Sequence, residues 1–243
     1  MRHGGDLTDA IARYGIVRDD WLDLSTGINP YAYPCPPGMP VEDAVRLPGQ
    51  DRLKHLLETA GTCYAVPEGV SICAAPGTEI LIRIQAMLVD GPSTLLPTSY
   101  RSYREAWTNA GKAIRNTADA DLGSLDKGCN IAVVSPNNPD GRVVGADRLL
   151  AWARSRAETA SLIVDEAFAD VEPDCSIVPH LEPDDRVIVF RSFGKFFGLP
   201  GLRLGFAIGA ASLVEPIRAV LGDWPVSAAA LQAGISALGD RPW

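Results

Sequence analysis

The sequence alternates between short apolar runs and amphipathic stretches, and this alternation constrains the fold more than any other feature. From residue 69 onward, runs rich in β-branched residues are separated by stretches with helical spacing. The runs cover residues 69–75, 93–96, 131–134, 162–164, 187–190 and 204–208. Helical candidates lie at residues 79–89, 103–109 and 147–158. Because most runs are continuously apolar, they indicate an α/β sheet that is covered on both faces.

The composition of the chain limits the kinds of partner that the protein can bind. With 243 residues, 47% of them apolar, the chain can bury one large core and part of a second. The net charge of −8 without a Lys/Arg cluster argues against a nucleic-acid or membrane partner and favours a small molecule. No apolar stretch reaches the about 18 residues of a membrane span, so we expect a cytoplasmic protein. The spacing of the five cysteines and three histidines predicts reduced thiols and no metal site.

Polar clusters follow the apolar runs, where each predicted strand ends. They lie at residues 76–79, 135–141, 165–168 and 192–195. Open α/β sheets bind ligands beyond the carboxyl ends of their strands, so we expect all four clusters to face one crevice.

Each cluster also has a structural interpretation when it is taken alone. Gly77 and Thr78 precede a helix, where they could hold a phosphate or serve as an ordinary N-cap. Residues 137–141 are also a sound turn sequence. Asp165 ends a buried strand and therefore needs a cationic partner, although a structural salt bridge or helix cap would also explain it.

A lysine and an arginine add chemistry to these clusters. Lys195 lies among apolar residues, and such surroundings lower a lysine pKa and make the neutral amine available to attack a carbonyl. Arg203, eight positions on, supplies a planar donor fork suited to a phosphate dianion. A lysine in such a position is seldom a mere surface charge.

Taken in order, four motifs are similar to those of fold-type I pyridoxal-phosphate enzymes. They are Gly77-Thr78-Glu79, Asn137-Asn138-Pro139-x-Gly141, Asp165-Glu166-Ala167-Phe168, and Ser192-x-x-Lys195 followed by Gly201-Leu202-Arg203-Leu204-Gly205. The chain most resembles the histidinol-phosphate aminotransferase branch, and residues 3–6 and 23–30 resemble threonine-phosphate decarboxylases of cobalamin biosynthesis. The resemblance implies the aspartate aminotransferase fold, with three α/β/α layers and a mostly parallel sheet.

The resemblance also implies roles around pyridoxal 5'-phosphate. Lys195 is expected to hold the cofactor as a Schiff base and to move protons, and Asp165 to pair with the ring nitrogen. Asn138 is expected to donate a hydrogen bond to the ring oxygen. The other predicted cofactor-binding residues are Gly77, Thr78, Ser192 and Arg203 at the phosphate, and Tyr100 or, as second choice, Tyr103 stacked on the ring. Ordinary packing is the alternative for both tyrosines.

The chain departs from the family pattern in two places. Phe168 stands where many relatives have a tyrosine that donates to the ring oxygen, so a Schiff base with a different pKa is expected. Relatives also continue for roughly another 100 residues, in a small domain that supplies the arginine for the substrate carboxylate. The expected parts are an N-terminal arm and linker at residues 1–40, a large cofactor-binding domain at residues 41–235, and the start of a truncated small domain at residues 236–243.

These expectations favour one reaction and leave two alternatives open. The first hypothesis is decarboxylation of L-threonine O-3-phosphate to (R)-1-amino-2-propanol phosphate in cobalamin biosynthesis. His3 and Asn29 are then expected to bind this phosphorylated amino acid, although His3 could also be a disordered terminal residue. An aminotransferase of the histidinol-phosphate type, or an inert cofactor-binding or interaction module, would fit the same motifs. By resemblance, a homodimer is expected.

Overall fold

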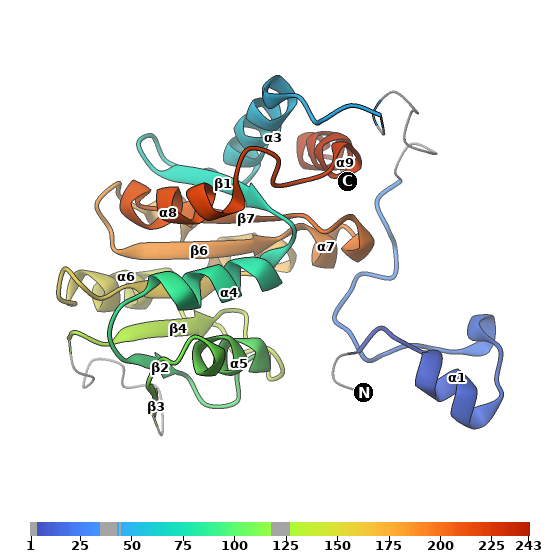
Figure 1. Ribbon diagram of the computed structural model, residues 1–243, viewed down its shortest axis with the longest axis horizontal. Coiled ribbons are helices and arrows are strands. Elements are labelled where there is room, and N and C mark those ends of the chain that lie inside the picture. Colours follow the sequence, from blue (N-terminus) through green and yellow to red (C-terminus); the bar gives the residue numbers. More distant parts are fainter. Residues whose placement is uncertain (1–3, 35–42, 44, 118–126) are drawn as a thin grey trace.

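The computed structural model describes residues 4–34, 43, 45–117 and 127–243. Within these residues, seven strands form one sheet in the order β1-β7-β6-β5-β4-β2-β3 (Figure 1). The strands are β1 (Ser71–Ala75), β2 (Ser93–Leu95), β3 (Ile114–Asn116), β4 (Asn130–Val134), β5 (Leu162–Asp165), β6 (Val187–Ser192) and β7 (Gly205–Gly209). Only β7 runs antiparallel to its neighbours β1 and β6, so the predicted mostly parallel sheet is confirmed.

Helices cover both faces of the sheet. The α-helices are α1 (Thr8–Tyr14), α3 (Gln50–Cys63), α4 (Thr78–Leu88), α5 (Arg101–Asn109), α6 (Ala146–Arg154), α7 (Phe193–Phe196), α8 (Ala211–Leu221) and α9 (Ala228–Gly239). Short 3-10 helices are η1 (Arg18–Asp20), η3 (Ala169–Val171), η4 (Pro173–Cys175), η5 (Val178–His180) and η6 (Pro200–Leu202). Helices α4, α5 and α8 lie in front of the sheet in Figure 1. None of the described helices is long and apolar enough to cross a membrane.

Two apolar clusters explain why the strands are continuously apolar. Ile163 of β5 belongs to the cluster under α4, α5 and α8, whereas the next residue, Val164, belongs to the cluster under α3, α6 and α9. Successive strand residues point to opposite faces, so a sheet buried on both sides needs apolar residues at both. The covered sheet predicted from the sequence is therefore present.

Two elements differ from their predicted bounds. The helix expected at residues 147–158 ends at Arg154, because the Ala157 N–H donates to the Lys127 carbonyl oxygen (3.1 Å) and the chain has left the helix. The apolar run at residues 187–190 continues as strand through Arg191 to Ser192. The predicted domain boundary between residues 235 and 236 falls inside α9, which packs against α3.

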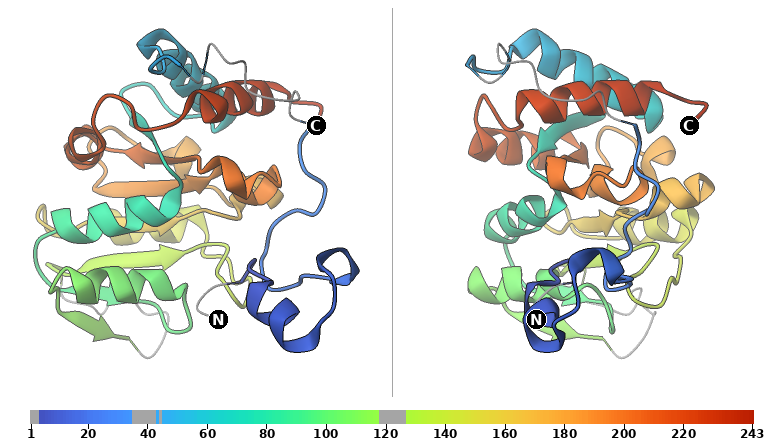
Figure 2. Two further views of the ribbon diagram at one scale, coloured as in Figure 1. Left: turned by 45° about the vertical axis from the view of Figure 1, so that its right-hand side comes forward. Right: turned by 90° about the vertical axis from the view of Figure 1, so that its right-hand side faces the viewer.

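The strand directions bring the polar segments to one edge of the sheet. Gly205, the first residue of β7, pairs with Ala75 at the end of β1 and with Ser192 at the end of β6. Figure 2 (right) faces this edge, and the N-terminal segment, residues 4–34 in blue, runs across it past α7. The N–H of Asn29 donates to the Lys195 carbonyl oxygen at 3.0 Å, which fixes the segment to α7.

Candidate active site

A buried carboxylate lies at the centre of the candidate site. Asp165 ends β5 and is 3% exposed. Its Oδ2 accepts a hydrogen bond from the Tyr103 hydroxyl at 3.1 Å, and its Oδ1 accepts one from the Ala167 N–H at 3.0 Å. Burial raises the pKa of Asp165 to about 6, although both hydrogen bonds and the charge of Lys195 act in the opposite direction. Such a carboxylate is suited to hold a buried cationic partner.

Lys195 lies in α7, directly after β6, and is partly buried. Burial lowers the pKa of its amine, Asp165 raises it and Arg203 lowers it again, with a net shift downward. The Nζ atom lies 5.7 Å from the centre of the Phe168 ring. At a given pH, a larger fraction of this amine is therefore neutral than on an ordinary surface lysine.

Two cavities flank the Phe168 ring. One of about 380 Å³ is lined by Lys195 and Asn29, and one of about 360 Å³ is lined by Asn138; Gly27 and Phe168 line both. A Cβ atom on Gly27 would lie 2.8 Å from Phe168 Cε1, so a glycine is needed where the N-terminal segment crosses the ring. The N-terminal segment thus forms a wall of the candidate site.

Close packing around two glycines forms a cradle next to α4. Gly77 has φ +83°, and a Cβ atom there would lie 2.5 Å from Arg203 Nη2. A Cβ atom on Gly205 would lie 2.9 Å from the Thr78 nitrogen, and Ser192 pairs with Gly205 beside it. The Arg203 guanidinium is exposed against the first turn of α4. Backbone N–H groups at a helix start together with a guanidinium are suited to bind a phosphate.

The other predicted residues occupy different positions around these groups. Tyr103 is fully buried with its hydroxyl on Asp165, whereas Tyr100 is partly buried and donates to Glu79 Oε2 at 3.4 Å. Asn138 is exposed, but it lines a cavity beside Phe168. Their roles toward a cofactor stay predictions.

The two residues predicted to bind substrate are only partly described. Asn29 lines the cavity that holds Lys195, and its amide nitrogen donates to the Phe196 carbonyl oxygen at 2.9 Å. His3 lies outside the described residues. No group of three or more potential metal ligands is found among the residues that are described.

The sequence interpretation assigned no role to Glu166 and Arg191, which form a buried ion pair at 2.9 Å beside the site. One signal was available, because each charge directly adjoins a predicted site residue at the end of an apolar strand. The apolar run ends at residue 190 because the charged Arg191 follows it. Strand β6 continues through it because Glu166 and Asp170 compensate its charge.

Comparison with known proteins places the chain in a family. The model of the family "Aminotransferase class I and II" matches residues 54–242. A threonine-phosphate decarboxylase from Sinorhizobium sp is 41% identical, with 94% of this chain and 69% of the relative covered. One from Pseudomonas aeruginosa is 40% identical, with 99% and 72% covered. A histidinol-phosphate aminotransferase from Sodalis glossinidius is 29% identical, with 88% and 63% covered.

Solved structures share the fold at lower identity. The histidinol-phosphate aminotransferase of Clostridium acetobutylicum matches with a TM-score of 0.73 and 20% identity over 83% of this chain and 63% of that protein. The L-threonine-O-3-phosphate decarboxylase of Porphyromonas gingivalis matches with a TM-score of 0.71 and 20% identity over 82% and 62%. A histidinol-phosphate aminotransferase of Sinorhizobium meliloti, solved in complex with pyridoxal-5'-phosphate, matches with 0.71 and 21% over 83% and 58%.

These matches cover most of the chain, and they agree on one fold. The chain spans 69% and 72% of the length of the two decarboxylases, and between 58% and 63% of the length of the three solved structures. The family model matches well over half of the chain, and we conclude that the chain belongs to the class I and II aminotransferase family.

Proposed function

We propose that this protein binds pyridoxal 5'-phosphate and decarboxylates L-threonine O-3-phosphate to (R)-1-amino-2-propanol phosphate, a step of cobalamin biosynthesis. The observation that carries the substrate is the identity of 41% and 40% to two threonine-phosphate decarboxylases along nearly the whole chain. The aminotransferase relative is more distant at 29%. A lyase is therefore favoured over a transferase.

The residues at the sheet edge fit this cofactor. The cradle of Gly77, Thr78 and Arg203 offers donors and a positive charge for a phosphate dianion. The buried carboxylate of Asp165 offers a counter-ion for a protonated ring nitrogen. The partly buried amine of Lys195 offers a nucleophile for the carbonyl carbon. Phosphate, ring nitrogen and carbonyl thus each have a partner of suitable chemistry.

The chain's own side chains would prepare and carry out the proton transfers. When bound, pyridoxal phosphate supplies a conjugated ring that accepts the electron pair left at the substrate α-carbon. In the proposed decarboxylation the bond from the α-carbon to the carboxylate breaks and carbon dioxide leaves, and Lys195 Nζ in its protonated form would donate the proton that replaces it. The lowered pKa of Lys195 favours this donation. The Phe168 ring lies over one side of this amine, 5.7 Å from Nζ to the ring centre.

Asp165 must stay ionised to hold a proton on the ring nitrogen. Tyr103 supports the ionised form, because its hydroxyl donates to Oδ2. Burial and the neighbouring Asp165 charge raise the Tyr103 pKa well above its ordinary value, so the phenol keeps its proton and remains a donor. Asn29 and His3 are the proposed contacts to the phosphorylated substrate, and Asn29 already lines the cavity beside Lys195.

A product assay tests the proposed reaction. The purified chain with pyridoxal phosphate is given either L-threonine O-3-phosphate alone or histidinol phosphate with 2-oxoglutarate. We expect carbon dioxide and aminopropanol phosphate from the first mixture and no glutamate from the second. A Lys195→Ala variant serves as the control and is expected to release no carbon dioxide.

Each other outcome identifies a different alternative. Glutamate formation without carbon dioxide would assign the chain to the histidinol-phosphate type of aminotransferase. Cofactor binding without either product would favour an inert cofactor-binding or interaction module. Both results would contradict the proposed decarboxylation.

We further propose that the protein works as a cytoplasmic homodimer. The N-terminal segment carries large apolar side chains that are exposed, among them Leu22 (79%), Leu24 (80%) and Tyr31 (81%). A subunit contact would bury such side chains, which lie close together in the sequence. The described cysteines are free thiols, as is usual in the reducing cytoplasm.

A further inference from the structure

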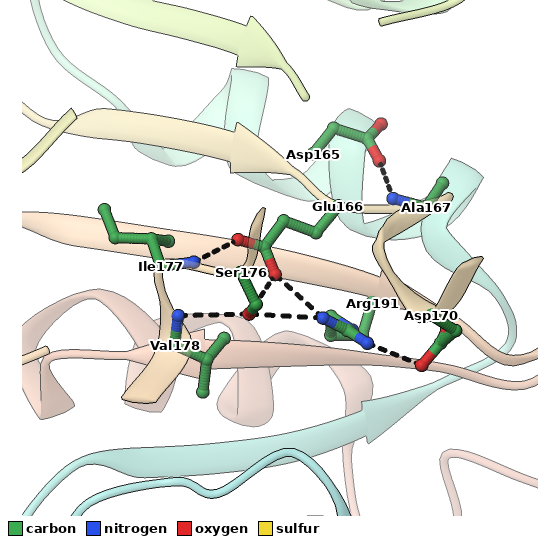
Figure 3. A network of polar contacts seen from close by, with 8 residues as sticks. All are labelled: Asp165, Glu166, Ala167, Asp170, Ser176, Ile177, Val178 and Arg191. Carbon is green, nitrogen blue, oxygen red and sulfur yellow. Dashed lines mark hydrogen bonds and ion pairs between the residues drawn. The ribbon is translucent and has the colours of Figure 1, made fainter. Parts of the chain in front are cut away.

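A buried network of charges lies behind the candidate site, on the other face of the sheet (Figure 3). Arg191 donates to Glu166 Oε2 at 2.9 Å and to Asp170 Oδ1 at 2.5 Å. Glu166 also accepts hydrogen bonds from the Ser176 hydroxyl and from the Ile177 N–H, each at 2.7 Å. One guanidinium thereby joins three segments of the chain.

The charges in this network are nearly inaccessible to water. The side chains of Arg191, Glu166 and Asp170 are 4%, 1% and 11% exposed. Burial alone would lower the pKa of Arg191. The nearby Asp170, Tyr64 and Glu166 raise the pKa by more than burial lowers it, so the guanidinium stays charged. The Tyr64 ring covers the guanidinium at 4.4 Å from the ring centre. Arg191 is therefore a structural cation rather than a ligand for substrate.

Each member of the ion pair adjoins a proposed cofactor residue. Glu166 follows Asp165, and Figure 3 shows the two side chains pointing away from one another. Arg191 precedes Ser192, and strand residues alternate between the two faces of the sheet. The ion pair therefore joins the ends of β5 and β6 from behind, while Asp165 and Ser192 face the site.

The third member, Asp170, anchors the loop that carries Phe168. This loop leaves β5 at Asp165 and returns through η3, where Asp170 binds Arg191. Phe168 lies between these two anchor points, with its ring near Lys195 Nζ. The charged groups that act on the same amine are Asp165 from β5 and Arg203 from the segment before β7. Displacement of the loop would change the surroundings of Nζ on its Phe168 side.

We propose that Arg191 is a positioning residue, which through Glu166 and Asp170 holds the Asp165–Asp170 loop against the Lys195 amine. It contacts neither substrate nor cofactor, and it acts by keeping Phe168 and Asp165 in place relative to Nζ. The use of that amine in catalysis rests on the proposed function, whereas the mechanical link does not.

The test compares two Asp→Asn substitutions, one at Asp170, which binds Arg191 near the end of β6, and one at Asp185, which precedes β6. Asp170→Asn removes one ion pair of Arg191. Asp185→Asn removes an ion pair with Arg154 (2.9 Å) before the strand begins, in which Asp185 is buried and Arg154 is 45% exposed. The cofactor-free variants are treated with an amine-reactive anhydride across a pH series, and labelling of Lys195 is measured by mass spectrometry. Lys54, which is 77% exposed, is the internal reference. Thermal unfolding is recorded for each variant.

We expect Asp170→Asn to raise the pH midpoint of Lys195 labelling by about half a unit, because water reaches the amine when the loop loosens. That shift corresponds to roughly threefold slower labelling at a fixed pH below the midpoint. Asp185→Asn should reduce stability without moving the midpoint. Ser176→Ala removes the hydrogen bond to Glu166 and those that the hydroxyl accepts from Arg191 and Val178, but it keeps both ion pairs of Arg191. It should give a smaller shift in the same direction, and it replaces Asp170→Asn if that variant does not fold.

Unchanged midpoints in both network variants would overturn the proposal, and so would an equal shift in Asp185→Asn. Either result would reduce the network to a general contribution to stability. The readout uses the chain without cofactor, so it remains valid even if pyridoxal phosphate does not bind. Failure of the proposed function and failure of the positioning role are therefore distinguishable.

Discussion

At the scale of single residues, Asp165 shows how a site can oppose stability. Its pKa is raised from 3.8 to about 6 by burial, so folding takes up a proton at this carboxyl between these values. The contribution of Asp165 to stability therefore falls as the pH rises from about 4 to 6, and it is level above that range. At pH 7 the buried charge costs about 3 kcal/mol in the cofactor-free chain.

Substitution Asp165→Asn removes this buried charge and keeps the shape of the side chain. We expect the cofactor-free variant to be up to about 3 kcal/mol more stable than the wild type at pH 7, with a gain about 1 kcal/mol smaller at pH 5, because the wild-type carboxyl is then mostly protonated. Urea unfolding at both pH values measures the difference. A variant that is less stable at pH 7, or a gain that does not change with pH, would contradict the raised pKa.

The residues that were predictable from the sequence are those whose chemistry lies in local motifs. Asp165 and Lys195 each follow an apolar strand, and the sheet topology then brings their segments to one edge. The link from Glu166 to Arg191 spans 25 positions and depends on strand pairing. A single sequence shows the two charges but not their contact. For the same reason, the hydrogen bond from Tyr103 to Asp165 was not predicted.

At the scale of elements, the apolar pattern of the sequence predicted the interior strands but not the edge strand β3. Strands β4, β5 and β6 match their predicted apolar runs closely and have polar residues only at one end: the first residue of β4 and the last residues of β5 and β6. The edge strand β3 was not predicted, because its three residues Ile114, Arg115 and Asn116 have no apolar pattern. An edge strand has one neighbour and little buried surface, so its sequence carries little signal.

The proposed dimer contact can be tested at the N-terminal segment. If its exposed apolar side chains contact a second subunit, light scattering should give a mass near twice the 25.9 kDa of one chain. We expect Leu22→Asp to shift the protein toward the monomer, because a charge would be buried in the contact. Val220→Asp, at a 53% exposed position of α8, is the matched control. A wild-type mass of one chain, or equal effects of both substitutions, would contradict this role of the segment.

At the scale of the whole molecule, the fold brings distant parts of the chain to one place. The cradle at Gly77, the carboxylate of Asp165 and the amine of Lys195 come from three different strand ends. The single antiparallel strand β7 brings Arg203 to the same edge, because its amino end lies beside the carboxyl ends of β1 and β6. The central claim is that this edge binds pyridoxal phosphate through Lys195.

The visible absorbance spectrum of the chain with pyridoxal phosphate, recorded before and after borohydride and beside the Lys195→Ala variant, tests this claim most directly. We expect a visible absorbance band of the bound cofactor in the wild type, which borohydride abolishes and which the variant lacks. In the reduced protein, the cofactor should be attached covalently to Lys195. If wild type and variant give the same spectrum, Lys195 does not hold the cofactor. The proposed active site would then be wrong for this chain.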